Sequence, residues 1–336
     1  MRSIMTALAG LLAVFPALAR DPQLSATEIE IREWQVPWEK SRPRDPAVAA
    51  DGRVWFVGQA ADYVAVFDPD EESFTRFDLP EGAGPHTVIV TADQQIWYAG
   101  NRDSHLGHLD PDSGEIERVE TPEDGAQDPH TFVEDSTGRI WFTAQWGNHV
   151  GRYDRKTGDI ELVAVPTERA RPYGIVVDNA DNAWVALFGT NKIARVDAET
   201  FELTEIDLPR EQARPRRIAW TEDGVWYGDY NQGYLGRYVP GNGSIDEWRL
   251  PGGDQSGPYA LMADDQGRVW AFETWQDPNR LVGFDPGSES FFAAGTVPSG
   301  GGTVRHMWFD DSSSSLWFGT DTNYLGQAVL PRGPSE

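Results

Sequence analysis

Cysteine is absent from the 336 residues of this chain. Without thiols the chain forms no disulfide framework, and it offers no site for a c-type haem or a lipid-modified cysteine. Metal sites built on thiolates are excluded for the same reason. The stability of the fold must therefore come from its core alone.

Basic residues are few, because 28 Lys and Arg residues stand against 54 Asp and Glu residues and give a formal net charge of −26 at pH 7. Such a chain repels polyanions, so nucleic acid and anionic membranes are poor partners. We interpret the acidity as a solvated, self-repelling surface suited to an extracytoplasmic or salty environment. An acidic docking face for a cationic partner is the alternative.

Long hydrophobic runs are lacking outside the N-terminus. There, Arg2 precedes an apolar run from Ile4 to Leu18 that ends in the small-residue site Ala17-Leu18-Ala19, a pattern typical of a signal peptide. The run is short and interrupted, and no later segment is long enough to span a bilayer. We predict that residues 1–19 are a signal peptide cleaved near Ala19, and that the protein is periplasmic or secreted with no membrane span.

Several common catalytic motifs are also missing. The sequence contains no glycine-rich phosphate loop, no Gly-x-Ser-x-Gly elbow and no His-Glu-x-x-His pair. The sequence therefore gives no support for a P-loop nucleotide-binding protein, an α/β-hydrolase or a zinc peptidase. Its function must be inferred from other features.

What the sequence does contain is a tryptophan repeat. Each tryptophan follows a turn rich in Asp, Gly, Asn or Ser and precedes a second apolar residue, which is the signature of a tight β-hairpin. Four strand-like segments per repeat and seven repeats predict an all-β, seven-bladed β-propeller of four-stranded blades. At one fixed position per blade, the tryptophans are expected to pack between sheets rather than carry chemistry. They are Trp55, Trp97, Trp141, Trp184, Trp226, Trp270 and Trp317.

The last repeat, from Thr303 to Leu330, has only three strand-like segments. Ile29 to Pro37 has the pattern of an outer strand, so we predict that the N-terminal strand completes the last blade and closes the ring. A solenoid is the alternative, but it would need polar caps that the sequence does not show. The predicted division is a short linker at 20–25, a single propeller domain at 26–331 and a tail at 332–336.

A candidate site follows from this architecture. The start of the first strand lies beside the end of the second, and first strands line the propeller axis, so these positions meet at one mouth of the channel. The predicted strand starts are Ala47, His86, His130, Tyr173, Arg216, Tyr259 and Arg305. The facing strand ends are Gln59, Asn101, Gln145, Asp229, Glu273 and Asp321, and the loops that follow carry His105, His149, Trp146, Phe188, Tyr230 and Trp275.

Clustered His, Arg, acidic and aromatic residues at a mouth are not required by blade packing, and they indicate a ligand site. With His306, five of the six histidines map to this face. Each histidine taken alone is more often a solvated or hydrogen-bonded residue than a ligand contact. Glu273 likewise fits a salt bridge to Arg305 or Arg216 as well as it fits a base or a metal ligand.

Two segments carry a resemblance to a known family. Residues 172–185 read Pro-Tyr-Gly-Ile-Val-Val-Asp-Asn-Ala-Asp-Asn-Ala-Trp-Val, and residues 148–154 read Asn-His-Val-Gly-Arg-Tyr-Asp. They resemble the repeat of the virginiamycin B lyase (streptogramin lyase) family, over nearly all of the chain after the leader. The resemblance implies a single seven-bladed propeller and an enzyme that opens a cyclic depsipeptide by elimination across its ester, with a rim histidine as base and Mg²⁺ held by rim residues.

The family's motifs recur only in part. Its Pro-His element appears at Pro85-His86 and Pro129-His130, and the glutamate of its Trp-Phe-Thr-Glu element appears as Glu273. In the family a histidine shares a late blade with that glutamate, whereas here Tyr259 takes the histidine's place. The last blade has Arg305-His306 and Thr320-Asp321 instead.

The sequence is compatible with three functions. The first is a metal-assisted lyase or hydrolase acting on an ester or lactone, with His130 or His86 as base and Arg216 or Arg305 stabilising the oxyanion. Its Mg²⁺ or Ca²⁺ ligands would be Glu273, Asp229 and Asp321. The second is a non-catalytic exported propeller that binds a carbohydrate, peptide or protein, and the third is a lactonase similar to gluconolactonase. In each case we expect a monomer. The predicted substrate contacts are Tyr173, Tyr259, Trp146, Phe188, Tyr230, Trp275, Gln145 and Asn101.

Overall fold

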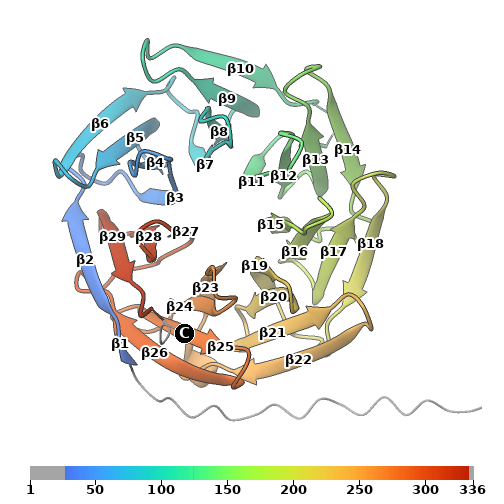
Figure 1. Ribbon diagram of the computed structural model, residues 1–336. Helices are drawn as coiled ribbons and strands as arrows, with labels where there is room; N and C mark the ends of the chain where they lie inside the picture. The colour runs from blue at the N-terminus through green and yellow to red at the C-terminus, as the bar shows by residue number, and fades with distance from the viewer. Residues whose placement is uncertain (1–26, 124, 333–336) are drawn as a thin grey trace, which may run out of the picture.

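The computed structural model describes residues 27–123 and 125–332, and within them the chain forms seven sheets arranged in a ring (Figure 1). The predicted seven-bladed propeller is confirmed. The predicted signal peptide and linker lie outside the described residues. Among the described residues, no helix has the length and apolarity needed to cross a membrane.

Each of the first six blades is built from four strands that follow one another in the chain. Blade one has β3 (Pro43–Val48), β4 (Val54–Gly58), β5 (Tyr63–Asp68) and β6 (Ser73–Asp78). Blade two has β7 (Pro85–Val90), β8 (Ile96–Gly100), β9 (His105–Leu109) and β10 (Ile116–Glu120). Blade three has β11 (Pro129–Glu134), β12 (Ile140–Ala144), β13 (His149–Tyr153) and β14 (Ile160–Ala164).

The second half of the ring repeats this order. Blade four has β15 (Pro172–Val177), β16 (Ala183–Leu187), β17 (Lys192–Val196) and β18 (Leu203–Asp207). Blade five has β19 (Pro215–Thr221), β20 (Gly224–Asp229), β21 (Tyr234–Val239) and β22 (Ser244–Arg249). Blade six has β23 (Pro258–Ala263), β24 (Val269–Glu273), β25 (Arg280–Asp285) and β26 (Ser290–Thr296), and a 3₁₀ turn, η1 (Gly253–Gln255), precedes it.

Blade seven is completed by the N-terminus, as predicted. Its own strands are β27 (Met307–Asp310), β28 (Ser315–Gly319) and β29 (Tyr324–Val329), and β2 (Glu30–Gln35) pairs antiparallel with β29. The sequence did not indicate that β1 (Thr27–Glu28) would also add to blade six, where it pairs in parallel with β26. The N-terminal segment therefore joins two blades.

The first strand of every blade faces the centre of the ring, and the last strand lies at its outside (Figure 1). The second strands, such as β4, are buried along their whole length, whereas outer strands, such as β6, alternate exposed and partly buried residues. This difference arises because inner sheets are covered on both faces by neighbouring blades, while outer strands keep one face in water.

The repeated tryptophans pack between blades, and none is more than 5% exposed. The indole N–H of Trp141 donates to Asp135, that of Trp184 to Asp178 and that of Trp270 to Asp264. Each of these aspartates also accepts backbone N–H bonds of its own hairpin turn. One carboxylate thus satisfies both the turn and the buried indole.

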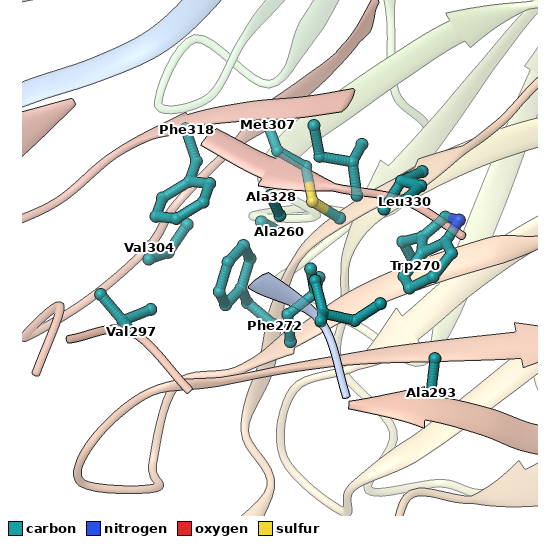
Figure 2. Packing of buried hydrophobic residues seen from close by; sticks show 13 residues of the cluster. Ala260, Trp270, Phe272, Ala293, Val297, Val304, Met307, Phe318, Ala328 and Leu330 are labelled. Carbon is teal, nitrogen blue, oxygen red and sulfur yellow. The ribbon is translucent and has the colours of Figure 1, made fainter. Parts of the chain in front are cut away.

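The core between blades six and seven illustrates this packing. Trp270 and Phe272 of β24 face Met307 of β27 and Phe318 of β28 (Figure 2). The Phe272 and Phe318 rings meet edge-on with centroids 4.7 Å apart. Ile29 belongs to the same cluster, so the chain's N-terminal segment is anchored by apolar burial as well as by strand pairing.

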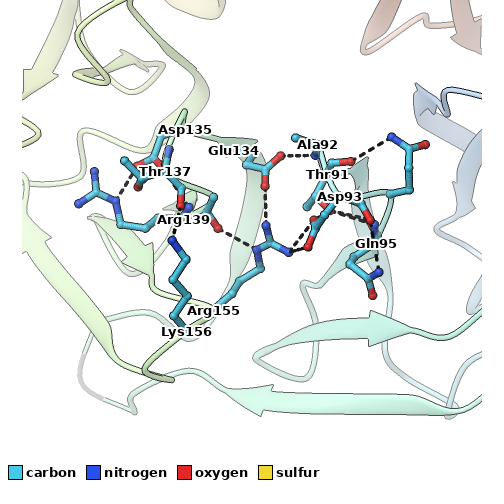
Figure 3. A network of polar contacts seen from close by, with 12 residues as sticks. Thr91, Ala92, Asp93, Gln95, Glu134, Asp135, Thr137, Arg139, Arg155 and Lys156 are labelled. Atoms are coloured by element: carbon cyan, nitrogen blue, oxygen red, sulfur yellow. Dashed lines mark hydrogen bonds and ion pairs between the residues drawn. The ribbon is translucent and has the colours of Figure 1, made fainter.

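On the face that carries the hairpin turns, charged side chains join neighbouring blades. Arg155 reaches Glu134 at 2.6 Å and Asp93 at 2.9 Å (Figure 3). Glu134 in turn accepts from the backbone N–H of Ala92. Because Asp93 is largely exposed, its pair with Arg155 adds little stability and serves mainly to fix how blades two and three meet.

The pairing of β2 with β29 predicts that the N-terminal segment stabilises the whole ring. Deleting residues 20–38 removes β1 and β2 and leaves β29 and β26 with open edges, so we expect the melting temperature to fall by at least ~10 °C. Differential scanning calorimetry measures the change. The matched control lacks only residues 20–26 and should melt like the chain that begins at residue 20. A 20–38 deletion that melts within a degree or two of that control would contradict closure by β2.

Candidate functional site

The strand starts meet at the propeller axis, with one correction to the predicted set. Blade one begins at Pro43, which pairs with Gly58, so the residue equivalent to His86 is Arg44. Ala47 lies further along β3, opposite Trp55, and is buried in the blade. The prediction was wrong because Pro43 and Pro46 stand close together, and only the strand register decides which of them starts the blade. The strand-start ring is therefore Arg44, His86, His130, Tyr173, Arg216, Tyr259 and Arg305.

Five members of the strand-start ring form a continuous cluster. The rings of His86 and His130 have centroids 3.4 Å apart, and the His130 and Tyr173 centroids are 4.1 Å apart. The Tyr173 hydroxyl is hydrogen-bonded to the Tyr259 hydroxyl, and Arg216 Nη2 donates to the same Tyr259 oxygen at 2.8 Å. The two histidines and two tyrosines are each less than 5% exposed.

The residue that follows Arg216 joins four blades. Arg217 Nη2 lies 2.8 Å from Asp45 Oδ2 in blade one, and Nη1 donates to Thr131 in blade three at 3.1 Å. Its Nε donates to the carbonyl oxygen of Arg305 in blade seven at 3.1 Å. Arg44 binds the other oxygen of Asp45 at 2.9 Å. We call Arg44, Asp45 and Arg217 the axial ion-pair cluster.

Sequence reasoning missed the axial ion-pair cluster, although a signal was present. Asp45 and Arg217 occupy the second position after the strand-starting proline in their blades, as does Thr131. Aligning these second positions would have placed one carboxylate and one guanidinium at the same depth of the axis. Burial alone raises the pKa of Asp45, but Arg44 and Arg217 outweigh it and hold that pKa below its ordinary value.

The buried histidines are neutral. Burial, reinforced by the charges of Arg44 and Arg217, lowers the pKa of His86 and of His130 well below the ordinary value. The same causes bring the pKa of His306 to about 3. An imidazole with so low a pKa is a weak proton acceptor, so these residues are poorly matched to the predicted role of base at neutral pH.

The tyrosine pair has the opposite electrostatics. Burial raises the pKa of the Tyr173 hydroxyl, but the neighbouring guanidiniums, led by Arg216, outweigh burial and lower that pKa below its ordinary value. Burial and the neighbouring Tyr173 raise the pKa of Tyr259. Tyr173 is therefore the member of the pair that loses its proton first, while Tyr259 keeps its proton and donates a hydrogen bond.

Above the tyrosine pair lie the predicted aromatic contacts. We call Trp146, Phe188, Tyr230 and Trp275 the rim aromatics. The Arg216 guanidinium carbon is 3.5 Å from the ring centroid of Tyr259 and 4.5 Å from those of Phe188 and Tyr230. Tyr230 in turn contacts Trp275, whose indole N–H donates to the Tyr230 hydroxyl at 3.1 Å.

A second arginine, Arg171, lies among the rim aromatics on the side of blade three. Arg171 stacks 4.4 Å from the Trp146 centroid and 5.0 Å from that of Phe188. In the amide orientation that satisfies both groups, Gln145 accepts from Arg171 Nε at 3.1 Å. Trp146 is 72% exposed and Trp275 is 42% exposed, so the two indoles offer open faces to a ligand.

Other predicted residues are taken up by the fold. The Asn101 amide donates to two backbone carbonyls at the start of blade three, beside a rim cleft of about 480 Å³ that Trp146 also lines. His105 and His149 begin third strands and bind Tyr98 and the Gly147 carbonyl respectively. The structure therefore does not bring these two histidines into the strand-start ring.

The three predicted metal ligands are not brought together. Glu273 is fully buried and accepts from the Gly252 N–H at 2.6 Å, from the Ser256 hydroxyl at 2.8 Å and from Arg280. Its ion-pair partner is therefore Arg280, not Arg305 or Arg216 as the sequence suggested. Glu273 thus stabilises the loop that leads into its own blade, because a carboxylate at a strand end can accept hydrogen bonds from nearby backbone amides.

Asp229 and Asp321 also have partners within the protein. Asp229 Oδ1 accepts the backbone N–H groups of Arg214, Asn231 and Gln232, whereas its buried Oδ2 has no hydrogen bond and lies 3.9 Å from Arg210 Nε. Asp321 is paired with Arg305. Within residues 27–123 and 125–332, no three His, Cys, Asp or Glu side chains are grouped so as to hold a metal ion. Glu273, Asp229 and Asp321 therefore do not form the single Mg²⁺ site that the sequence predicted for them.

A sequence model of the virginiamycin B lyase family matches residues 25–286. The chain belongs to this family. No curated protein matches it. The family's repeat is thus shared over most of the propeller, while the residues at the mouth differ from those that the resemblance implied.

Solved structures support the fold. The virginiamycin B lyase of Staphylococcus aureus is 21% identical, with a TM-score of 0.81 over 90% of this chain and 100% of that one. A catalytically inactive variant of that enzyme, solved with quinupristin, is 22% identical over the same shares, also with a TM-score of 0.81. The WD40 propeller domain of Doa1 is 12% identical, with a TM-score of 0.73 over 93% of this chain and 97% of that domain.

The axial ion-pair cluster predicts a pH-dependent loss of stability. Asp45→Asn leaves Arg44 and Arg217 buried without a counter-charge, so we expect a loss of about 3–5 kcal/mol at pH 7. Because the folded-state pKa of Asp45 is lowered, its contribution is present above the unfolded pKa of ~3.9 and is lost as pH falls toward the folded value. Urea unfolding from pH 7 to 3 should show the gap between wild type and variant narrowing below about pH 4. A constant gap would contradict the assignment.

The contacts of Glu273 predict a structural rather than a metal-binding role. Glu273→Gln removes the charge that Arg280 pairs with, and we expect about 1–3 kcal/mol of destabilisation in metal-free buffer. Thermal unfolding in EDTA measures it. Exposed Asp51→Asn, which alters a carboxylate on the opposite face, is the control and should change stability little. An unchanged melting temperature together with weakened Mg²⁺ binding by calorimetry would restore the metal-ligand reading.

Proposed function

We propose that this protein is a carbon–oxygen lyase that opens an ester or lactone at the channel mouth. Family membership supports the reaction class. The observation that carries the proposal is the hydrogen-bonded hydroxyl pair of Tyr173 and Tyr259 under the Arg216 guanidinium, at the floor of the rim aromatics. A base, a proton donor and a cation are thereby held within one contact network.

In this mechanism Tyr173 takes the place that the sequence assigned to His130 or His86. Ionised Tyr173 takes the proton from the α-carbon next to a substrate carbonyl and becomes neutral. The electron pair of that C–H bond forms a C=C bond to the β-carbon, and the bond between the β-carbon and the ester oxygen breaks, so that a carboxylate departs. Tyr259 donates a hydrogen bond to Tyr173 and keeps the phenolate oriented. Arg216 stabilises the negative charge that develops on the carbonyl oxygen and then on the leaving carboxylate.

No step in this mechanism is routed through a metal, because the predicted ligands are not grouped around one point in the part of the chain that the structure describes. The lactonase alternative loses support for the same reason, since it needs several acids around one ion. We also propose that the protein works outside the cytoplasm. That proposal rests on the N-terminal sequence alone.

A non-catalytic binding module is the second candidate. The exposed indoles of Trp146 and Trp275 favour it, because open aromatic faces at a rim bind rings and sugars without chemistry. The two functions differ in one measurable respect, which is turnover that depends on the Tyr173 hydroxyl.

The test is Tyr173→Phe, which removes the hydroxyl and keeps the ring. We expect kcat on a panel of lactones and cyclic depsipeptides to fall by at least ~100-fold. In wild type, kcat should fall as pH falls through the lowered pKa of Tyr173, and this limb should vanish in the variant. Tyr238→Phe, which removes a hydroxyl from the body of blade five, is the matched control.

Two outcomes would contradict the mechanism. His130→Ala abolishing turnover while Tyr173→Phe leaves it intact would return the base to histidine. Absence of turnover of every ester and lactone by the unmodified protein would leave the binding module ahead.

A further inference from the structure

Two arginines at the mouth have no carboxylate partner. Within the described residues, neither Arg171 nor Arg216 forms an ion pair, although the chain carries nearly twice as many acidic as basic residues. The nearby acids are committed elsewhere: Asp45 to the axial ion-pair cluster, and Glu273 to Arg280. The mouth is therefore a cationic spot in an acidic protein.

The Arg216 guanidinium is only partly satisfied. One of its terminal nitrogens donates to the tyrosine pair, but its Nε is buried and has no partner among the described residues. Arg44 Nη2, which lies in the same strand-start ring, is also buried without a hydrogen bond. Buried charged donors are normally paired, so these two guanidinium nitrogens lack an acceptor that the described residues do not provide.

The shape of this spot selects for a flat group. Phe188 lies between the two guanidiniums, with its ring centroid 5.0 Å from the Arg171 carbon and 4.5 Å from the Arg216 carbon. Tyr259 covers one face of Arg216 at 3.5 Å; because Nη2 donates to the tyrosine pair and Nε is buried, Nη1 is the Arg216 nitrogen left to donate to a ligand. Charge-assisted hydrogen bonds from two guanidiniums match the two coplanar oxygens of a carboxylate.

We propose that the mouth recognises aromatic carboxylates, with the carboxylate held by Arg171 and Arg216 and the ring resting on the rim aromatics. The inference rests on the proposed function in placing the substrate at this mouth, and it adds the substrate's chemical class: an ester or lactone that also carries a free carboxylate on or near a ring. The strong negative charge of the remaining surface then disfavours anionic ligands everywhere except at this spot.

The test compares 2-naphthoate with its neutral isostere 2-naphthamide, using the mature protein and isothermal titration calorimetry. We expect naphthoate to bind at least ~10-fold more tightly than the amide, and the preference to shrink as salt is raised. Arg216→Gln and Arg171→Gln should each weaken naphthoate by at least ~10-fold and leave the amide within ~2-fold. Arg53→Gln, an exposed arginine on the opposite face, is the control and should change neither.

Equal affinity for the acid and the amide would overturn the inference. So would displacement of naphthoate by inorganic phosphate at a lower concentration than by acetate, since the spot would then serve phosphate. Arg171→Lys guards against a folding defect, because it keeps the charge and should retain the preference for the acid. Naphthoate has no ester, so selective binding without any lyase turnover would support the carboxylate site and contradict the proposed reaction.

Discussion

The pairing of β2 with β29 is the constraint on which the rest of the molecule depends. Seven twisted sheets leave no free edge only if the last one receives its outer strand from the first residues of the domain. That pairing also sets where blade one stands relative to blade seven, because Trp34 of β2 stacks on Trp317 and contacts Phe67. The ring then brings Asp45 within reach of Arg217 from the far side of the axis.

The axis shows how a structural charge cluster also shapes a site. Asp45 neutralises one of two buried guanidiniums. Burial, reinforced by the excess positive charge, lowers the pKa of the histidines, and the same charge lowers the pKa of Tyr173. Close approach of the inner strands is part of the same arrangement. A Cβ on Gly174 would lie 2.9 Å from the Cα of Arg217, so a side chain at that position would force blades four and five apart.

The fold was predictable from the sequence, and much of the mouth was not. The tryptophan period and the missing fourth strand are local patterns, so they identified seven blades and the closing role of residues 29–37. Phe188 and Trp275 both contact Tyr230 because strand starts and the loops that follow have fixed places in a blade. Blade one was misplaced because Pro43 and Pro46 offered two starts that only strand pairing distinguishes.

The acids were the least predictable part of the site. Whether a carboxylate at a strand end points to the axis or turns back to its own loop depends on which amides the loop presents. Gly252 and Ser256 donate hydrogen bonds to Glu273. Both residues lie in a turn whose conformation cannot be inferred from its amino-acid composition. Arg217 was missed for a related reason, since its partners lie 86 to 172 positions away in the chain.

The contacts of Arg217 with four blades also determine how a ligand can enter and leave the central channel. Arg217, Asp45 and Thr131 are each no more than 2% exposed, so their side chains block the bore at this depth and the hole in the ring is not a through-passage. Whatever enters at the mouth must leave by the same opening. A reaction that releases an anion next to Arg171 and Arg216 would then show product inhibition, because the anionic product occupies the site that the next substrate must enter.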